Sequence, residues 1–154
     1  MTVLRDLLGP NLAVVFCGTA VSAVSARRRA YYAGPGNAFW PTLFKVGLPP
    51  HLFRPEEYKS LRNYGLGLTD LVKTVSGGDH SLSREHFDPR RLRTKILKYR
   101  PRMVAFTSKR AAEEFLGHPV EYGLLREKIG DTALFVLPSP SGAARAHWKE
   151  APWR

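Results

Sequence analysis

The chain has 154 residues, with 24 lysines and arginines against 13 aspartates and glutamates, so its formal net charge is +11 at pH 7. Because 44% of the residues are hydrophobic, the chain can build a packed core and is not a disordered basic tail. The length suits one domain over residues 1–154. The positive excess favours a polyanionic partner such as nucleic acid over an acidic protein or a neutral metabolite.

Cysteine and histidine usage limits the cofactors that the chain can hold. The one cysteine, Cys17, excludes an internal disulfide framework, an all-cysteine zinc site and a four-cysteine iron–sulfur cluster. The five histidines do not have the spacing of metal ligands. We therefore expect no metal site.

An apolar stretch near the N-terminus, residues 12–26, resembles a signal peptide that ends in a small-residue cleavage site. The preceding segment argues against this interpretation, because Asp6 offsets Arg5 and the pair Gly9-Pro10 breaks an early helix. No other stretch approaches the roughly 20 apolar residues that span a bilayer. We therefore expect a soluble, unprocessed protein without a membrane partner, located in the cytoplasm and, in a bacterium, at the nucleoid.

The first predicted strand covers residues 12–17, a short apolar run rich in β-branched side chains and closed by a glycine. This pattern is typical of a central parallel strand that is covered on both faces. Residues 102–107 and 132–138 repeat it, whereas residues 67–72 are a weaker candidate because Asp70 interrupts their apolar run.

Helical patterns lie between these strands. Residues 39–46 are one candidate, and Asp88, which is followed by a proline, predicts the start of a second helix that ends before Pro101. Ser108 is placed to cap a third helix over residues 109–116, which a glycine ends.

A Gly-Asp pair at 130–131 predicts a hairpin turn between residues 121–129 and the strand that ends at Leu137. Strands that alternate with helices predict a layered α/β domain with a mainly parallel sheet. In such sheets, ligands bind beyond the carboxyl ends of the strands. The segments after Cys17, around Asp70 and after Leu137 are therefore the candidate binding loops.

The loop after the first strand, residues 18–40, combines small residues with arginines and tyrosines. The small side chains allow a ligand to approach the backbone, and Tyr31 and Tyr32 offer rings on which a base can stack. Alternatively, the arginines are a solvated run and the tyrosines are ordinary packing residues. The loop at 137–145 is a Pro/Ser turn whose hydroxyl and N–H groups can hold a phosphate.

Eight basic residues lie between Arg84 and Arg102, against two acidic ones. Four of them recur at spacings of four, three and four and are expected to share one helix face: Arg91, Lys95, Lys98 and Arg102. This face is either a surface that tracks DNA or the solvated outer side of a helix.

Together, the loops resemble those of the mismatch-specific uracil/thymine-DNA glycosylases of the uracil-DNA glycosylase superfamily. The resemblance runs from about Val3 to Arg145. It rests on VVFCG, on P-x-N-x-F-W at 35–40, on GLTDLV at 67–72 and on L-P-S-P-S-G-x-x-R at 137–145. It implies a three-layer α/β/α domain with a short, mainly parallel sheet, and an enzyme that flips a base out of DNA and hydrolyses its N-glycosidic bond without a cofactor.

The resemblance also implies two sets of site residues. The ring of Tyr32 would stack on the flipped base and the backbone after the first strand would bind its edge, so the base-binding set is Gly18, Thr19, Ala20, Tyr32, Asn37 and Asp70. A second set would contact the DNA, its last member filling the space that the base leaves: Arg27, Arg28, Arg29, Ser141, Gly142, Ala143 and Arg145.

Three positions that bear on catalysis depart from the family's pattern. Ala20 stands where the family usually has an asparagine that positions the attacking water, and Ser139 stands where relatives have asparagine or histidine. Asp70 lies where thymine-type relatives place an asparagine that faces the base. Our hypothesis is that Asp70 takes over the work of the missing asparagine, because a carboxylate can orient water and stabilise an oxocarbenium-like sugar. Alternatively, Asp70 caps a turn or pairs with a basic neighbour.

The sequence therefore predicts a monomeric, monofunctional DNA glycosylase that initiates base-excision repair. Its expected substrate is double-stranded DNA containing uracil, with single-stranded DNA and other deaminated or mismatched bases left open. No lysine occupies a family position for Schiff-base chemistry, so strand cleavage is not expected. One alternative is a glycosylase fold that binds lesions without excision. Another is an unrelated hydrolase or nucleotide-binding domain, although the nucleophile-elbow and phosphate-loop motifs are missing.

Overall fold

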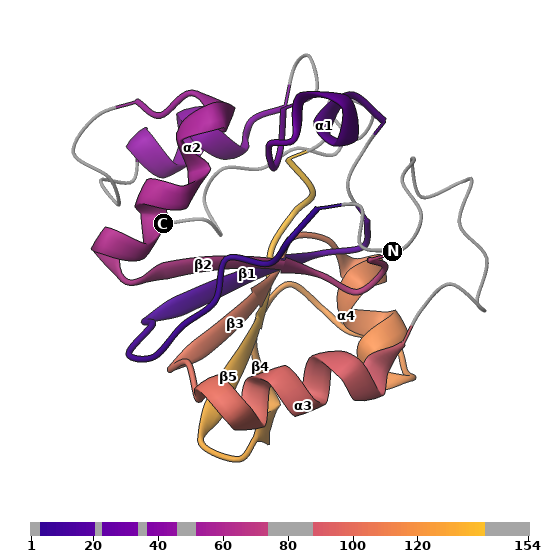
Figure 1. The fold of residues 1–154 in the computed structure, drawn as a ribbon. Helices are drawn as coiled ribbons and strands as arrows, with labels where there is room; N and C mark the ends of the chain where they lie inside the picture. The colour runs from indigo at the N-terminus through magenta and orange to yellow at the C-terminus, as the bar shows by residue number, and fades with distance from the viewer. Residues whose placement is uncertain (1–3, 21–22, 34–36, 46–51, 74–87, 141–154) are drawn as a thin grey trace.

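A mainly parallel sheet forms the centre of the protein in the computed structural model, which describes residues 4–20, 23–33, 37–45, 52–73 and 88–140 (Figure 1). Within these residues the sheet has five strands in the order β2-β1-β3-β5-β4. They are β1 (Val14–Gly18), β2 (Leu66–Asp70), β3 (Met103–Phe106), β4 (Gly123–Ile129) and β5 (Thr132–Val136). Only the β4–β5 pair is antiparallel, so the mainly parallel sheet is confirmed. The weaker strand predicted at 67–72 is also present, but it ends at Asp70 instead of continuing past it.

The sheet carries a hydrophobic cluster on each face, because successive side chains of a strand point to opposite sides. In β1, Phe16 belongs to one cluster, and Val15 and Cys17 belong to the other. The first cluster includes side chains of α1 (Ala23–Arg28), α2 (Phe39–Lys45) and the 3-10 helix η1 (Pro55–Tyr64), and the second includes side chains of α3 (Pro89–Tyr99) and α4 (Lys109–Leu116). Figure 1 shows α1 and α2 on one side of the sheet and α3 and α4 on the other, which confirms the three-layer α/β/α prediction.

The helix ends follow local signals in the sequence. Asp88 caps α3 by accepting a hydrogen bond from the backbone N–H of Arg91 at 3.4 Å. Ser108 caps α4 in the same way, from the N–H of Ala111 at 3.1 Å. α4 ends at Gly117, whose φ of 83° is a left-handed conformation that glycine adopts without strain. The predicted boundaries of these two helices are confirmed.

The structure differs from the prediction in two places between the strands. α1 lies inside the segment that we expected to be a loop, and η1 has no counterpart among the predicted elements. Both are short, and neither follows a clear apolar repeat.

The expected basic face is wrong in part. α3 ends at Tyr99, so Arg102 lies beyond the helix, and Lys95 contacts Asp6 instead of facing the solvent with its neighbours. The apolar stretch near the N-terminus is divided between β1 and the beginning of α1. None of the described helices has the length and hydrophobicity that are needed to cross a membrane.

Candidate active site at the carboxyl ends of the parallel strands

Three neighbouring strands end together and place polar groups side by side. Gly18 at the end of β1 pairs in register with Asp70 at the end of β2. Thr107 directly follows β3, and its backbone N–H donates to the carbonyl of Cys17 at 2.9 Å. This is the edge of the sheet where the sequence predicts ligand binding, because parallel strands present their carboxyl ends on one side.

Asp70 is a buried carboxylate with a lysine partner. It is 6% exposed, and its Oδ2 accepts a hydrogen bond from Nζ of Lys73 at 3.2 Å. After β2 the chain stays on the end of β1, since the backbone N–H groups of Leu71 and Val72 donate to the carbonyls of Gly18 and Thr19 at 3.0 and 2.7 Å. This turn brings Lys73 back over Asp70. Pairing with a basic neighbour, the alternative considered for Asp70, is therefore present.

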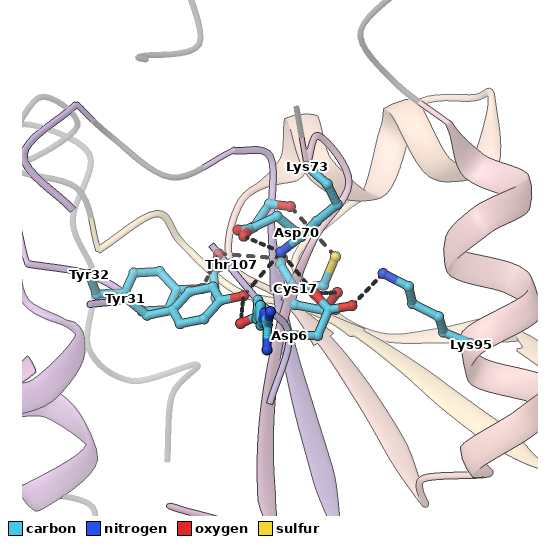
Figure 2. Close-up of polar contacts among 11 residues, drawn as sticks. Asp6, Cys17, Tyr31, Tyr32, Asp70, Lys73, Lys95 and Thr107 are labelled. Carbon is cyan, nitrogen blue, oxygen red and sulfur yellow. Dashed lines mark hydrogen bonds and ion pairs between the residues drawn. The ribbon is translucent and has the colours of Figure 1, made fainter. Parts of the chain in front are cut away.

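Lys73 joins three segments of the chain (Figure 2). Its Nζ lies 2.8 Å from Oδ1 of Asp6, 3.2 Å from Oδ2 of Asp70 and 3.1 Å from the hydroxyl of Tyr31. Asp6 reaches the site because Leu7 forms an antiparallel bridge with Leu68 of β2. The Lys73 side chain is 4% exposed, so these oxygens, and not water, stabilise its charge.

Asp6 in turn balances two lysines. It forms ion pairs with Lys73 and with Lys95 of α3, and it accepts a hydrogen bond from the hydroxyl of Thr69 at 2.7 Å. The cluster thus holds two acidic and two basic side chains, and their formal charges cancel.

Burial and pairing act in opposite directions on these groups. Burial raises the pKa of Asp70 above its ordinary value, and Lys73 only partly offsets this effect. For Lys73, burial lowers the pKa, but the charges of Asp70 and Asp6 outweigh burial and raise it overall. Burial also raises the pKa of Asp6, yet the attraction and hydrogen bonds of its lysine partners leave it below the ordinary value. Lys73 is therefore a cation, and Asp6 an anion, at neutral pH.

The ring of Tyr32 is fixed in place near Gly18 and Asp70, at the ends of the strands. Its ring stacks on Phe39 with 3.9 Å between centroids and 14° between planes, and its hydroxyl lies 3.2 Å from Oγ1 of Thr107. The residue has a left-handed backbone, with φ of 54°, and its side chain is only partly buried. Phe39 of α2 and Thr107 therefore hold the ring and the hydroxyl of Tyr32 in place near Asp70.

Gly18 is the point at which these groups converge. A Cβ atom added to Gly18 would lie 3.3 Å from Oδ1 of Asp70, 3.4 Å from Oγ1 of Thr107 and 3.6 Å from the hydroxyl of Tyr32. Glycine therefore leaves room for three polar groups to approach the end of β1. Thr19 and Ala20 continue from this point, the first buried and the second partly exposed.

The loop after β5 comes to the same side of the sheet. The carbonyl of Pro140 accepts a hydrogen bond from the N–H of Ala38 at 2.8 Å, which ties this loop to the start of α2. Ser139, directly before that contact, is partly exposed. The first and last candidate loops of the sequence therefore meet, as the sheet topology predicts.

A comparison with known proteins matches nearly the whole chain. The model of the family described as the uracil DNA glycosylase superfamily matches residues 6–154. The chain belongs to this superfamily.

Among solved structures, the chain is similar to a candidate uracil DNA glycosylase from Methanosarcina acetivorans, determined by solution NMR. The two share 25% sequence identity with a TM-score of 0.63, and the match covers 97% of this chain and 91% of the other. Superfamily membership supports a role as a DNA glycosylase and makes DNA a plausible partner.

Several predicted site residues have structural contacts of their own. Tyr31 is 1% exposed, and its carbonyl accepts a hydrogen bond from the indole N–H of Trp40, so its ring packs in the core and is not a stacking surface. Asn37 uses its Oδ1 to accept the N–H of Phe39 at 2.9 Å, at the start of α2. Its predicted contact with a base stays a prediction.

The structure describes only some of the predicted DNA-contacting residues, and their contact with DNA stays a prediction. Arg27, Arg28 and Arg29 are all exposed at the end of α1, but Arg28 pairs with Glu56 of η1 and also donates to the carbonyl of Ala33. The other four predicted DNA contacts lie outside the described residues: Ser141, Gly142, Ala143 and Arg145.

Sequence reasoning missed four polar members of the site: Asp6, Lys73, Lys95 and Thr107. Thr107 is the last residue of a predicted strand, so its place at the ligand-binding edge could have been found from the sequence. Lys73 could have been found from its spacing of three residues after Asp70. Nothing in the sequence around Asp6 or Lys95 indicates their contact, since they lie 89 residues apart.

Proposed function

We propose that this protein is a monofunctional DNA glycosylase of the mismatch-specific type that excises uracil from DNA. Other deaminated or mismatched bases are further candidate substrates. The observation that supports this best is the Asp70 carboxylate, which lies beside Gly18, Thr107 and Tyr32 at the carboxyl ends of three strands. The proposal includes action as a monomer in the cytoplasm on double-stranded DNA, with single-stranded DNA as a second substrate.

Base recognition would use surfaces that already exist around Gly18. An extruded base costs a few kcal/mol to unstack, and least when it is mispaired. Stacking on the ring of Tyr32 would offset about 1–3 kcal/mol of that cost. The ring does not have to reorganise, because Phe39 and Thr107 already hold it.

Hydrolysis would use Asp70 as the group that orients water. The water oxygen forms a bond to C1′ of the flipped nucleotide while the bond from C1′ to the base nitrogen breaks. Asp70 accepts the water proton, and the base leaves with the bonding electron pair. Backbone groups at Thr19 and Ala20 and the hydroxyl of Ser139 would stabilise the departing anion.

The state of Lys73 favours hydrolysis without strand cleavage. Schiff-base chemistry needs a neutral, accessible amine. Nζ of Lys73 instead donates to three oxygens, its side chain is 4% exposed, and the two carboxylates raise its pKa. A protonated ammonium in these contacts is not a nucleophile.

A second candidate is a glycosylase-fold protein that binds lesions without excision. Ala20 favours it, because a methyl group cannot hydrogen-bond the water that an asparagine at this position would hold. The two candidates differ in their product and not in their affinity for damaged DNA.

A gel assay on labelled oligonucleotides separates these candidates. The protein is incubated with U:G, U:A, T:G and hypoxanthine duplexes and with single-stranded uracil DNA, and abasic sites are then cleaved with alkali. Strand breaks from uracil DNA only after alkali support a monofunctional glycosylase. Breaks before alkali would contradict the proposed chemistry. Tight binding of uracil DNA without breaks would support the lesion-binding candidate, and neither binding nor breaks would overturn both.

A further inference from the structure

The two oxygens of the Asp70 carboxylate have different surroundings. Oδ2 accepts the hydrogen bond from Lys73. Oδ1 is the oxygen nearest to the position that a Cβ on Gly18 would take, close to Thr107 and Tyr32. Among the described residues no hydrogen bond reaches Oδ1, and every fully buried side-chain oxygen or nitrogen there has a partner. Oδ1 is therefore the oxygen of Asp70 that Lys73 leaves available, and it lies beside Gly18, Thr107 and Tyr32.

Lys73 is held too firmly to be a mobile counter-ion. An ammonium group has three N–H donors. In this structure they face three oxygens from separate segments, those of Asp6, Asp70 and Tyr31. Tyr31 is itself fixed, because its hydroxyl donates to the carbonyl of Arg5 at 3.0 Å and its ring lies in the core. Figure 2 shows Asp6, Asp70 and Tyr31 around the amino group of Lys73.

We propose that Lys73 is a positioning residue, which binds Oδ2 of Asp70 so that Oδ1 is directed at the attacking water and the carboxylate stays ionised. This inference rests on the proposed role of Asp70 in excision. Asp6 supports this arrangement, because it forms an ion pair with Lys73 and a second one with Lys95 of α3.

The charges around Asp70 make the positioning role measurable through the pH dependence of excision. Burial favours the neutral form of the Asp70 carboxyl group. The charges of Lys73 and Lys95 favour its ionised form, whereas the charge of Asp6 opposes ionisation. The titratable groups that face Asp70 are Asp6, Cys17, Tyr31, Tyr32, Lys73 and Lys95. Burial raises the pKa of Cys17 and of both tyrosines, so these three are neutral at working pH. Removing Lys73 would leave Asp70 buried with a second carboxylate nearby.

The test is the pH dependence of single-turnover uracil excision with protein in excess over a U:G duplex. We expect Lys73→Met to move the acid limb of the profile up by at least about one pH unit, which is about a tenfold loss on that limb. Lys73→Arg should keep the limb near its wild-type position. Asp6→Asn should move the limb to lower pH, because it removes a charge that opposes ionisation of Asp70.

Controls separate positioning from simple damage. Lys128→Met removes an exposed lysine of β4 and should leave the limb unmoved. A general loss of stability cannot shift the limb in opposite directions in Lys73→Met and Asp6→Asn. If Lys73→Met does not fold, as judged by circular dichroism, the shift in Asp6→Asn decides the question.

Two results would overturn the proposal in distinguishable ways. If Lys73→Met and Lys73→Arg lower the rate by the same factor at every pH, Lys73 is only structural, while Asp70 keeps its role provided that Asp70→Asn is inactive. If Asp70→Asn excises uracil normally, the proposed function of Asp70 fails and the positioning role fails with it.

Discussion

The charged groups at the strand ends and those on the outer side of α3 are arranged differently. At the site, Asp6, Asp70, Lys73 and Lys95 are paired with one another, and their formal charges sum to zero. On α3, four basic residues are exposed to solvent: Arg90, Arg91, Arg93 and Lys98. The single helix thus gives one lysine to the site and the rest to the surface.

The contrast shows what a net charge of +11 can and cannot indicate. Among the described residues, the basic side chains outside this cluster include the exposed ones of α3, which attract a polyanion at long range. The chemistry would occur where charges cancel, because a buried charge without a partner is too costly to keep. Surface charge and site charge should therefore respond to different experiments.

The largest expected effect comes from filling the space beside Gly18. Gly18→Ala places a Cβ 3.3 Å from Oδ1 of Asp70, which displaces the carboxylate or blocks its water. We expect single-turnover excision to fall by up to about 100-fold, the loss that a misplacement of about 1 Å can cause. Gly117→Asn is the matched control, because no atom lies within 4 Å of a Cβ there and asparagine tolerates a positive φ. Equal rates in the two variants would contradict the role of this corner.

The next effect concerns the ring of Tyr32. Tyr32→Ala removes a stacking surface worth about 1–3 kcal/mol, so excision should fall roughly 5- to 150-fold. Tyr32→Phe keeps the ring on Phe39 and removes only the hydrogen bond with Thr107, so it should retain most of the activity. Kinetics across substrate concentrations would check both. A Phe variant as impaired as the Ala variant would show that the hydroxyl matters, and not the ring.

The excision rate of the wild-type protein should depend on pH through the ionisation of Asp70. Burial raises the pKa of this carboxylate above 3.8, and only the ionised form can accept a proton from water. Excision should therefore fall as the pH drops through the raised pKa, about tenfold for each unit below it. A rate that stays constant down to pH 3.8 would contradict the assignment, once circular dichroism shows that the protein is still folded at that pH.

The smallest effect on chemistry is expected from the surface of α3. Replacing Arg90, Arg93 and Lys98 together by glutamine should weaken binding to undamaged DNA and flatten its salt dependence, by up to about 0.9 in log–log slope for each phosphate that the protein no longer neutralises. Excision by excess protein at low salt should change less than about twofold. Titrations at several salt concentrations would check this. Unchanged slopes would show that α3 faces away from the DNA.

The sequence predicts the sheet and the position of Asp70 because both depend on local patterns. Short apolar runs separated by capped helices determine a parallel sheet, and a polar residue at the end of such a run lies at the ligand-binding edge. The sequence left open whether Tyr31 is a stacking surface or a packing residue, because two adjacent tyrosines look alike in sequence. The backbone sends Tyr31 into the core and, with φ of 54°, turns Tyr32 toward Thr107.

The cluster of Asp6, Asp70, Lys73 and Lys95 could not be predicted because the contacts of Asp6 are long-range. Asp6 reaches Lys73 only through the bridge between Leu7 and Leu68, and neither leucine has a sequence signal for that pairing. Lys95 matches its exposed neighbours in type and spacing, so its contact with Asp6 follows from the packing of α3 on the sheet. Long-range pairing of this kind becomes visible only in three dimensions.

The most direct test of the central claim is single-turnover excision of uracil from a U:G duplex by Asp70→Asn. The amide is nearly isosteric with the carboxylate and keeps an oxygen for Lys73, but it cannot accept a proton from water. We expect the rate to fall to background while thermal unfolding and binding of uracil DNA stay close to wild type. Excision at a near-wild-type rate would contradict the account.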